Sequence, residues 1–185
     1  MEHVEVFLYS DSAGEVPAVL REMDPASDLQ SWKNHWQPLL QKSHEEDRHW
    51  DWINKYAKNA HVNFEYYVIE CDGMIQGMTM IETDFHRSKK KKNLVYVDFL
   101  SIAPWNRKKF VKEPKYKRTG SILIYAAVRR SEQLGYRYRI GLHSLPGAID
   151  FYVRIGMRDY GPDPQYQNLH YLEFDETSGK DFVQK

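Results

Sequence analysis

The segment from Leu94 to Gly161 constrains the fold of this chain more than any other. It begins with Leu94–Ile102, an apolar run that predicts a strand. A long basic loop follows, and a helix then opens at Thr119-Gly120 and continues to Leu134. A strand that leads into a helix opening on glycine offers free backbone N–H groups to a phosphate. The segment therefore predicts an α/β arrangement with an anion site at the start of its helix.

Two further strands and a short helix are predicted after this helix. Tyr138–His143 has the character of a strand, and Leu169–Phe174 reads as the strand that closes a sheet. Between them, Phe151 and Tyr152 lie on a short helix that ends before Gly156. Strands and helices thus alternate through the C-terminal half of the chain.

The N-terminal half supplies a hairpin and a first strand. Tyr66–Cys71 and Met74–Ile81 flank Asp72-Gly73, a pair that favours a type I′ hairpin turn. Val4–Tyr9 alternates weakly and suits a first strand, and a short helix is expected over Val16–Met23.

Two helices are expected between these strands. Asp28 can cap a helix whose apolar residues recur every three to four positions, and Pro38 predicts a kink or a break in it. A second helix is expected from Ser43 to Asn59. The tryptophans of these helices are expected to lie mostly in the core: Trp32, Trp36, Trp50 and Trp52.

Three sequence patterns together resemble the GNAT superfamily of acyl-CoA-dependent N-acyltransferases. The patterns are a strand ending in Leu100-Ser101-Ile102-Ala103-Pro104, a helix opening with Gly120-Ser121-Ile122-Leu123-Ile124, and the later set Ala148, Phe151-Tyr152 and Gly156-Met157. The resemblance implies an α/β (α+β) fold with a mixed, mostly antiparallel central sheet flanked by helices. It also implies a single domain over residues 1–175, and residues 176–185 are expected to form a flexible tail.

The loop between Pro104 and Gly120 departs from the family pattern. It is longer than usual, and it places Lys115 and Arg118 where the pattern has Arg or Gln and its first glycine. The fold implied by the resemblance is unaffected, but the loop geometry is left open.

The resemblance implies the transfer of an acetyl or other short acyl group from acyl-CoA to a primary amine, by direct attack in a ternary complex. Acetyl-CoA or another acyl-CoA is then the co-substrate, and no metal is implied. The backbone of Leu100, Ser101 and Ile102 would pair with the pantetheine amides as an extra strand would. The pyrophosphate would be held at the helix start by backbone N–H groups and basic side chains of Lys115, Lys117, Arg118, Thr119, Gly120, Ser121 and Ile122. Lys108, Lys109 or Lys112 could reach the 3′-phosphate.

Amine acylation needs a proton acceptor and a proton donor. An alkylamine has a pKa near ~10 and must lose a proton before it attacks a thioester. Tyr152 matches the proton donor of the family. For the base, Asp98 shares a strand face with Tyr96 and Leu100, and His143 lies at the mouth of the next strand with an ordinary pKa of about 6.5. A core or structural role remains the alternative for Tyr152, Asp98 and His143, and Glu82 is a weaker candidate base.

Composition limits the other classes of function. The chain has 26 Lys+Arg and 26 Asp+Glu, and this balance favours neither nucleic acid nor an acidic membrane as a partner. Basic residues nevertheless gather between Arg87 and Arg118, including the run Lys89-Lys90-Lys91-Lys92. The single cysteine, Cys71, excludes an internal disulfide and favours a reducing compartment. Without a long apolar run or a signal-like N-terminus, a cytoplasmic location is expected.

Three functions therefore stay open on the sequence. The first is an N-acetyltransferase acting on a small-molecule or peptide amine, as a monomer or a homodimer. The second is a non-catalytic acyl-CoA-binding protein, because the phosphate loop is poor in glycine. The third is a GNAT-type enzyme that acts on charged tRNA, and it ranks last because a lysine run is usually a solvated loop.

Overall fold

The computed structural model describes residues 3–60, 63–85 and 93–184. The elements, in chain order, are β1 (Val4–Ser10), β2 (Gly14–Glu22), α1 (Pro25–His35), α2 (Gln37–Gln41), η1 (Glu46–His49), α3 (Trp52–Asn59), β3 (Phe64–Cys71), β4 (Met74–Phe85), β5 (Leu94–Ile102), η2 (Pro104–Asn106), α4 (Thr119–Gln133), β6 (Ile140–Ser144), η3 (Pro146–Ala148), α5 (Ile149–Arg154), β7 (Arg158–Asp163), η4 (Pro164–Tyr166), β8 (Leu169–Phe174) and α6 (Glu176–Val183).

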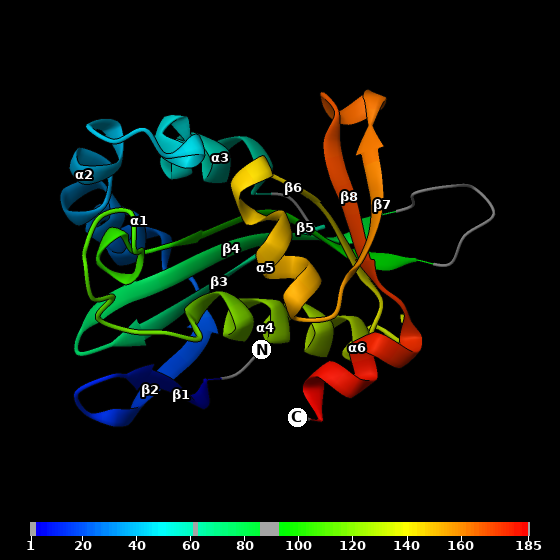
Figure 1. Cartoon of the computed structure of the whole chain (residues 1–185), viewed down its shortest axis with the longest axis horizontal. Coiled ribbons are helices and arrows are strands. Elements are labelled where there is room, and N and C mark those ends of the chain that lie inside the picture. The colour runs from blue at the N-terminus through cyan, green and yellow to red at the C-terminus, as the bar shows by residue number, and fades with distance from the viewer. Residues whose placement is uncertain (1–2, 61–62, 86–92, 185) are drawn as a thin grey trace. The chain divides into compact units, whose positions relative to one another are not determined.

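The strands are hydrogen-bonded in the order β1-β2-β3-β4-β5-β6-β8-β7 (Figure 1). Strands β5 and β6 are parallel, whereas β1–β2, β2–β3, β6–β8 and β7–β8 are antiparallel. The mixed, mostly antiparallel sheet predicted from the sequence is therefore confirmed. The chain divides into two compact units. The first unit contains residues Met1–Thr79 and Leu100–Leu123, and the second contains Met80–Phe99 and Ile124–Lys185.

Strand β2 of the first unit corrects the helix expected over Val16–Met23. It pairs with β1 on one side and with β3 on the other. Its side chains alternate between the two faces of the sheet, and Leu20 is fully buried, as is Leu8 on β1. Hydrogen bonding to two neighbouring strands outweighed the weak local preference for a helix.

Helix α1 begins four residues earlier than predicted. Its N-cap is Asp24, whose side chain accepts a hydrogen bond from the Ala26 N–H at 3.1 Å. Asp28, the predicted cap, lies inside the helix, and its carboxylate accepts two hydrogen bonds from Arg21 at 2.7 and 2.9 Å. The break predicted at Pro38 is confirmed, because α1 ends at His35 and a separate helix begins at Gln37.

The helix predicted over Ser43–Asn59 is wrong as a single element. A 3-10 turn, η1, occupies its first part, and α3 starts only after Asp51, whose side chain accepts a hydrogen bond from Asn54 N–H. Trp32 and Trp36 are fully buried and Trp52 nearly so, as expected. Helix α1 contacts both α2 and α3 (Figure 1).

The β3–β4 hairpin is confirmed, including its turn. Asp72 and Gly73 have φ angles of 52° and 69°, and two positive values are what a type I′ turn requires. Only residues that tolerate the left-handed region fit here, and the sequence supplies Asp-Gly.

Two elements of the second unit differ from expectation. Strand β7 was not predicted, because most of its residues are exposed and the sequence lacks apolar alternation there. Residues Glu176–Val183 form α6 instead of the expected loose tail. Asp175 and Ser178 form a capping box at its start, and Phe182 packs on Phe174 with ring centroids 5.1 Å apart. Within the described ranges, no helix is long and apolar enough to cross a membrane.

Candidate functional site

The end of β5 in the first unit is fixed by a buried ion pair. The Arg107 guanidinium donates two hydrogen bonds to the Asp47 carboxylate, at 2.8 and 2.7 Å. It also donates to the Ser101 hydroxyl at 2.8 Å and, through Nε, to the Ile102 carbonyl at 2.9 Å. The Ser101 hydroxyl in turn donates to Asp47 at 2.8 Å. The side chain of Ser101 and the carbonyl of Ile102, both predicted to meet acyl-CoA, are therefore engaged within the protein.

The ion pair determines the ionisation of Asp47. Burial opposes its ionised form, but the hydrogen bonds and the positive charge of Arg107, together with the Ser101 hydroxyl, hold the pKa of the carboxyl below its usual value. The side chains of Asp47 and Arg107 are only 8% and 11% exposed. This pair ties the N-terminal 3-10 turn η1 to the strand end that precedes the long loop.

The long loop is held by a second polar network, centred on the buried Gln76. Its side-chain oxygen accepts hydrogen bonds from Trp105 Nε1 at 2.8 Å and from Asn106 Nδ2 at 3.1 Å. Its backbone carbonyl accepts from the Ala103 N–H at 2.9 Å. Asn106 then accepts a hydrogen bond from the Tyr116 N–H at 2.9 Å, close to the far end of the loop. Asn106 thus links the two ends of the loop between Pro104 and Gly120, which is longer than in the family pattern.

The start of α4 is the segment at which the sequence predicts a pyrophosphate site. The Ile122 N–H makes the first intrahelical hydrogen bond, to Arg118 O at 3.0 Å, so the N–H groups of Thr119, Gly120 and Ser121 lie outside the helical ladder. Arg118 has a φ of 71°, in the region that glycine favours. This is the residue that the sequence aligns with the family's first glycine.

At the start of α4, the Thr119 side chain has a polar atom with no hydrogen-bond partner among the described residues. Its hydroxyl is buried and has no hydrogen-bond partner in the part of the chain that the structure describes. Its methyl group faces Gly77 on β4, where a Cβ atom would lie only 2.6 Å away. Gly77 therefore allows the start of the helix to approach the strand closely.

Three of the basic side chains predicted to bind phosphate pair with carboxylates of the β1–β2 and β3–β4 hairpins. Lys115 pairs with Asp72 at 3.4 Å, Lys117 with Asp11 at 2.5 Å and Arg118 with Glu15 at 2.9 Å. Lys109 pairs with Glu45 at 3.0 Å, while Lys108 and Lys112 are exposed. Ion pairs this exposed contribute little stability, so their cations can turn to a phosphate at small cost. The run Lys89–Lys92 lies outside the described residues.

In the second unit, Tyr152 lies on α5 and is only 7% exposed. Burial alone raises the pKa of its phenol, so the group stays protonated at neutral pH, as a proton donor must. The Phe151 ring packs on it edge-on, with centroids 5.0 Å apart. Among the described residues, none forms a hydrogen bond with the Tyr152 hydroxyl.

His143 is the buried centre of a polar cluster in the second unit. Its Nδ1 atom lies 2.8 Å from the Tyr96 hydroxyl, and its Nε2 atom lies 3.4 Å from the Asp163 carboxylate. Its ring stacks on Tyr166 at 3.7 Å between centroids and 10° between planes. The side chain is 4% exposed, so His143 lies deeper than a residue at a strand mouth.

Asp98 belongs to the same surroundings. Burial raises the pKa of Tyr96, and the negative charge of Asp98 raises it further. His143 therefore lies in hydrogen-bond contact with the phenol of Tyr96, and Asp98 acts on that phenol through its charge. Sequence reasoning missed Asp163 and Tyr166, because it had not predicted β7. Gln167 and Asn168 adopt positive φ angles where the chain turns from η4 into β8.

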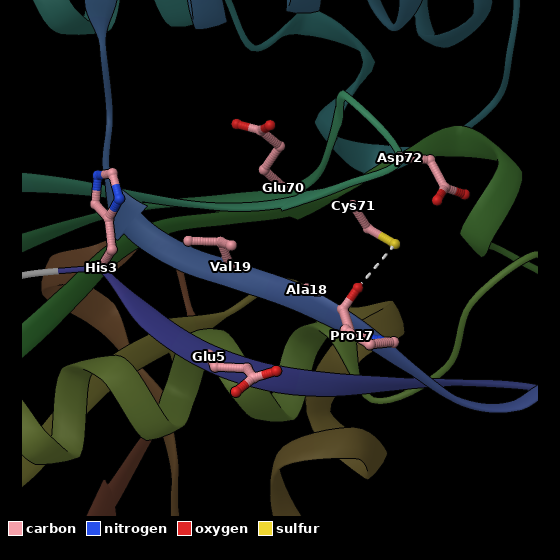
Figure 2. Close-up of a pocket in the computed structure, with 8 residues that line it drawn as sticks. All are labelled: His3, Glu5, Pro17, Ala18, Val19, Glu70, Cys71 and Asp72. Atoms are coloured by element: carbon pink, nitrogen blue, oxygen red, sulfur yellow. Dashed lines mark hydrogen bonds between the residues drawn. The ribbon is translucent and has the colours of Figure 1, made fainter.

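The single cysteine lies beside an open hollow of about 450 Å³ in the first unit (Figure 2). The Cys71 thiol is buried and donates to the Pro17 carbonyl at 3.5 Å. Burial raises the pKa of this thiol, so it is not a ready nucleophile. His3, Glu5 and Glu70 also line the hollow (Figure 2), but no group of three potential metal ligands occurs among the residues described.

No protein-family model matches the sequence, and no curated protein matches it either. Solved structures do match. An acetyltransferase of Trypanosoma brucei aligns with a TM-score of 0.55 at 17% identity, over 79% of this chain and 96% of its own. A mutant of the toxin AtaT, bound to the C-terminus of the antitoxin AtaR and to acetyl-CoA, gives 0.57 at 14% identity, over 91% and 99%. A Desulfovibrio desulfuricans protein assigned to the GNAT family of acetyltransferases gives 0.59 at 9% identity, over 86% and 99%. The chain has the GNAT fold.

Proposed function

We propose that the protein is an acyl-CoA-dependent N-acyltransferase that moves an acetyl or other short acyl group to a primary amine. The observation that carries this proposal is the start of α4. Three features occur together there in a chain that has the GNAT fold. They are backbone N–H groups outside the helical ladder, the left-handed backbone of Arg118 and, among the described residues, the unpaired Thr119 hydroxyl. A helix start of this kind suits the pyrophosphate of CoA.

Strand β5 suggests which peptide groups would pair with pantetheine. The Ala103 N–H bonds to β4, so by alternation the peptide groups of Ser101 face β4 as well. Those of Leu100 and Ile102 face the other way, and the Ile102 carbonyl is already bound by Arg107. The proposal therefore assigns the pantetheine contacts to the Leu100 backbone and the Ile102 N–H, with Ser101 in a supporting role.

The reaction proposed is direct attack in a ternary complex. The neutral amine nitrogen attacks the thioester carbonyl carbon, and the C–S bond breaks as the carbonyl re-forms. Tyr152 would donate its phenolic proton to the departing sulfur, and the amine proton would pass to Asp98 or His143. A covalent acyl-cysteine route is disfavoured, because Cys71 is the single cysteine and its thiol is buried and hydrogen-bonded.

Ligand-induced stabilisation tests the binding half of the proposal. Acetyl-CoA should raise the melting temperature in a concentration-dependent way, because it binds only the folded chain. Gly120→Glu should abolish the rise, since it adds bulk and negative charge where phosphate would lie. Gln133→Glu places the same charge at the opposite end of α4 and should leave the rise intact. A folded wild type that shows no rise at millimolar acetyl-CoA would overturn the proposal.

Thiol release separates the enzyme from a non-catalytic acyl-CoA-binding protein. The wild type should release CoA thiol from acetyl-CoA faster when an amine acceptor is added, and mass spectrometry should detect the acetylated amine. Stabilisation by acetyl-CoA with no amine-dependent release across a broad amine panel would support the non-catalytic alternative.

A further inference from the structure

Arg107 uses every donor of its guanidinium to connect η1 with the end of β5 in the first unit. Two of its hydrogen bonds go to the Asp47 carboxylate on η1, and one goes to Glu45 at the N-cap of η1. The other two go to β5, at the Ser101 hydroxyl and the Ile102 carbonyl. A guanidinium has five N–H donors in one plane, so this side chain is fully bonded and fixed in orientation.

The peptide group between Ile102 and Ala103 is held from both sides. Its carbonyl accepts a hydrogen bond from Arg107 Nε at 2.9 Å, and its N–H donates to the Gln76 carbonyl on β4 at 2.9 Å. The C=O and N–H of one trans peptide group point in opposite directions, so Arg107 binds β5 on the side away from Gln76. This is the side that we propose pairs with pantetheine. The guanidinium therefore occupies the acceptor next to the proposed Ile102 N–H contact.

A second buried arginine of the first unit, Arg21, has the same kind of bonding without touching β5. Its five hydrogen bonds go to Asp28, to Glu70 and to the Glu22 carbonyl. The side chain of Arg21 is 14% exposed and that of Arg107 is 11% exposed. The two arginines are therefore matched in burial and in hydrogen bonding, and they differ in the segments that they hold.

We propose that Arg107 is a positioning residue for acyl-CoA, which fixes the end of β5 for pairing with the pantetheine arm and ends that pairing at Ile102. The inference rests on the acyl-CoA binding proposed above. A strand end that is already held in place loses less conformational freedom when a ligand pairs with it, so the arm binds more tightly. Because the Ile102 carbonyl is occupied, the arm can pair no further along the strand, and this limit sets the position of the thioester.

Calorimetric titration tests this role without any turnover. The full chain is titrated with acetyl-CoA and with adenosine 3′-phosphate 5′-diphosphate, the half of CoA that lacks the pantetheine arm. Arg107→Lys keeps the positive charge, but an ammonium group cannot bond to all the groups that the planar guanidinium holds. It should weaken acetyl-CoA binding by about five-fold or more and leave the affinity for the nucleotide half within about two-fold of wild type. Arg21→Lys, the matched control, should change neither affinity.

Asp47→Asn provides a second variant, because it weakens the anchor of the guanidinium and leaves Arg107 in place. It should lower the affinity for acetyl-CoA by about two-fold or more, again without changing that for the nucleotide half.

The outcomes separate the positioning role from the proposed function. An unchanged acetyl-CoA affinity in Arg107→Lys, an equal loss for both ligands, or an equal loss in Arg21→Lys would overturn the positioning role while acyl-CoA binding stands. The same holds if the wild type binds acetyl-CoA no more tightly than the nucleotide half, because the arm would then contribute nothing. A wild type that binds neither ligand would overturn the proposed function, and the positioning role with it.

Discussion

The two units of the chain use polar groups in opposite ways. Around the end of β5 in the first unit, polar side chains are satisfied by one another, as in the Arg107–Asp47 pair and the Gln76 network. The groups proposed to bind a ligand there are mainly backbone N–H groups at the start of α4. In the second unit, the candidate groups are side chains: Tyr152, Asp98 and His143. A site that binds its ligand through backbone groups tolerates changes of sequence. Acid–base chemistry by side chains, in contrast, depends on the identity of each residue.

This contrast accounts for the absence of the family's first glycine from the loop that we propose binds phosphate. What the helix start needs at position 118 is a left-handed backbone, and Arg118 adopts it at a cost of about 1–2 kcal/mol. The networks around Asn106 and Arg107 hold the loop ends in place, which lets the fold impose that conformation. The predictions below test the two kinds of site against each other.

The largest effect is expected from Arg107→Met. Removing the cation of a buried ion pair leaves the charge of Asp47 with only the Ser101 hydroxyl as a partner, which should lower the free energy of unfolding by about 3–5 kcal/mol. Chemical denaturation measures this. The control, Lys117→Met, breaks an exposed pair with Asp11 and should cost under about 1 kcal/mol. Equal losses in the two variants would show that the Arg107–Asp47 pair does not hold the loop.

The next largest effect is expected in the second unit, from Tyr152→Phe. The change removes one hydroxyl, so kcat should fall by about ten-fold or more, or about 1.4 kcal/mol in the barrier. Stabilisation by acetyl-CoA should persist, because that binding is assigned to the first unit. Tyr160→Phe, at an exposed tyrosine, should leave kcat unchanged. An unaltered kcat in Tyr152→Phe would remove this residue from the mechanism.

A smaller effect is expected when the pH is lowered, on the contribution of Asp47 in the first unit to the free energy of unfolding. The pKa of Asp47 is lowered in the folded protein, so its stabilising contribution is present above the ordinary carboxyl pKa of about 3.9 and is lost as pH falls through the folded value. The difference in unfolding free energy between wild type and Asp47→Asn should therefore be constant from pH 7 to about 5 and shrink below about pH 4. A difference that shrinks already between pH 7 and 5 would mean that the pKa of Asp47 is raised instead.

The smallest effect is expected from Arg118→Gly. Glycine relieves the left-handed strain, but it removes the exposed pair with Glu15 and adds freedom to the unfolded chain, so stability should change by less than about 1 kcal/mol. The stabilisation by acetyl-CoA should survive, because backbone N–H groups carry the binding. Arg118→Val, which cannot take this φ without strain, should weaken both stability and CoA binding. Loss of the CoA effect in Arg118→Gly would assign phosphate binding to the side chain.

Local signals made some elements predictable. Turn chemistry predicts the Asp72-Gly73 turn, and the spacing of apolar residues predicts β5 and the helix that begins at Thr119. Other elements depend on partners far along the chain. Strand β2 was expected to be a helix, and it is a strand because β1 and β3 lie on either side of it. Helix α6 was expected to be loose, and it is ordered where Phe182 meets Phe174.

In the candidate site, too, the residues with local signals were predictable and those that depend on distant partners were not. The sequence pattern indicated Tyr152, Gly120 and the helix start, because a motif with fixed spacing is local. It could not indicate that Ser101 turns toward Asp47, or that His143 meets Tyr96 and Asp163, since those pairs are separated by 54, 47 and 20 positions. Long-range pairs of polar side chains carry no periodic signal.

Strands β5, β6 and β8, helix α4 and the lack of an internal disulfide could be predicted from local sequence signals and from the single cysteine, whereas β7 and α6 could not. The tertiary structure decided which of the many charged residues act together. Arg107 was one basic residue among a dozen in the region between Arg87 and Arg118, and burial against Asp47 made it structural. His143 was one histidine of eight, and three neighbouring elements made it the centre of a cluster. The physical reason is that charge and hydrogen bonding depend on distance and burial, which only the folded chain defines.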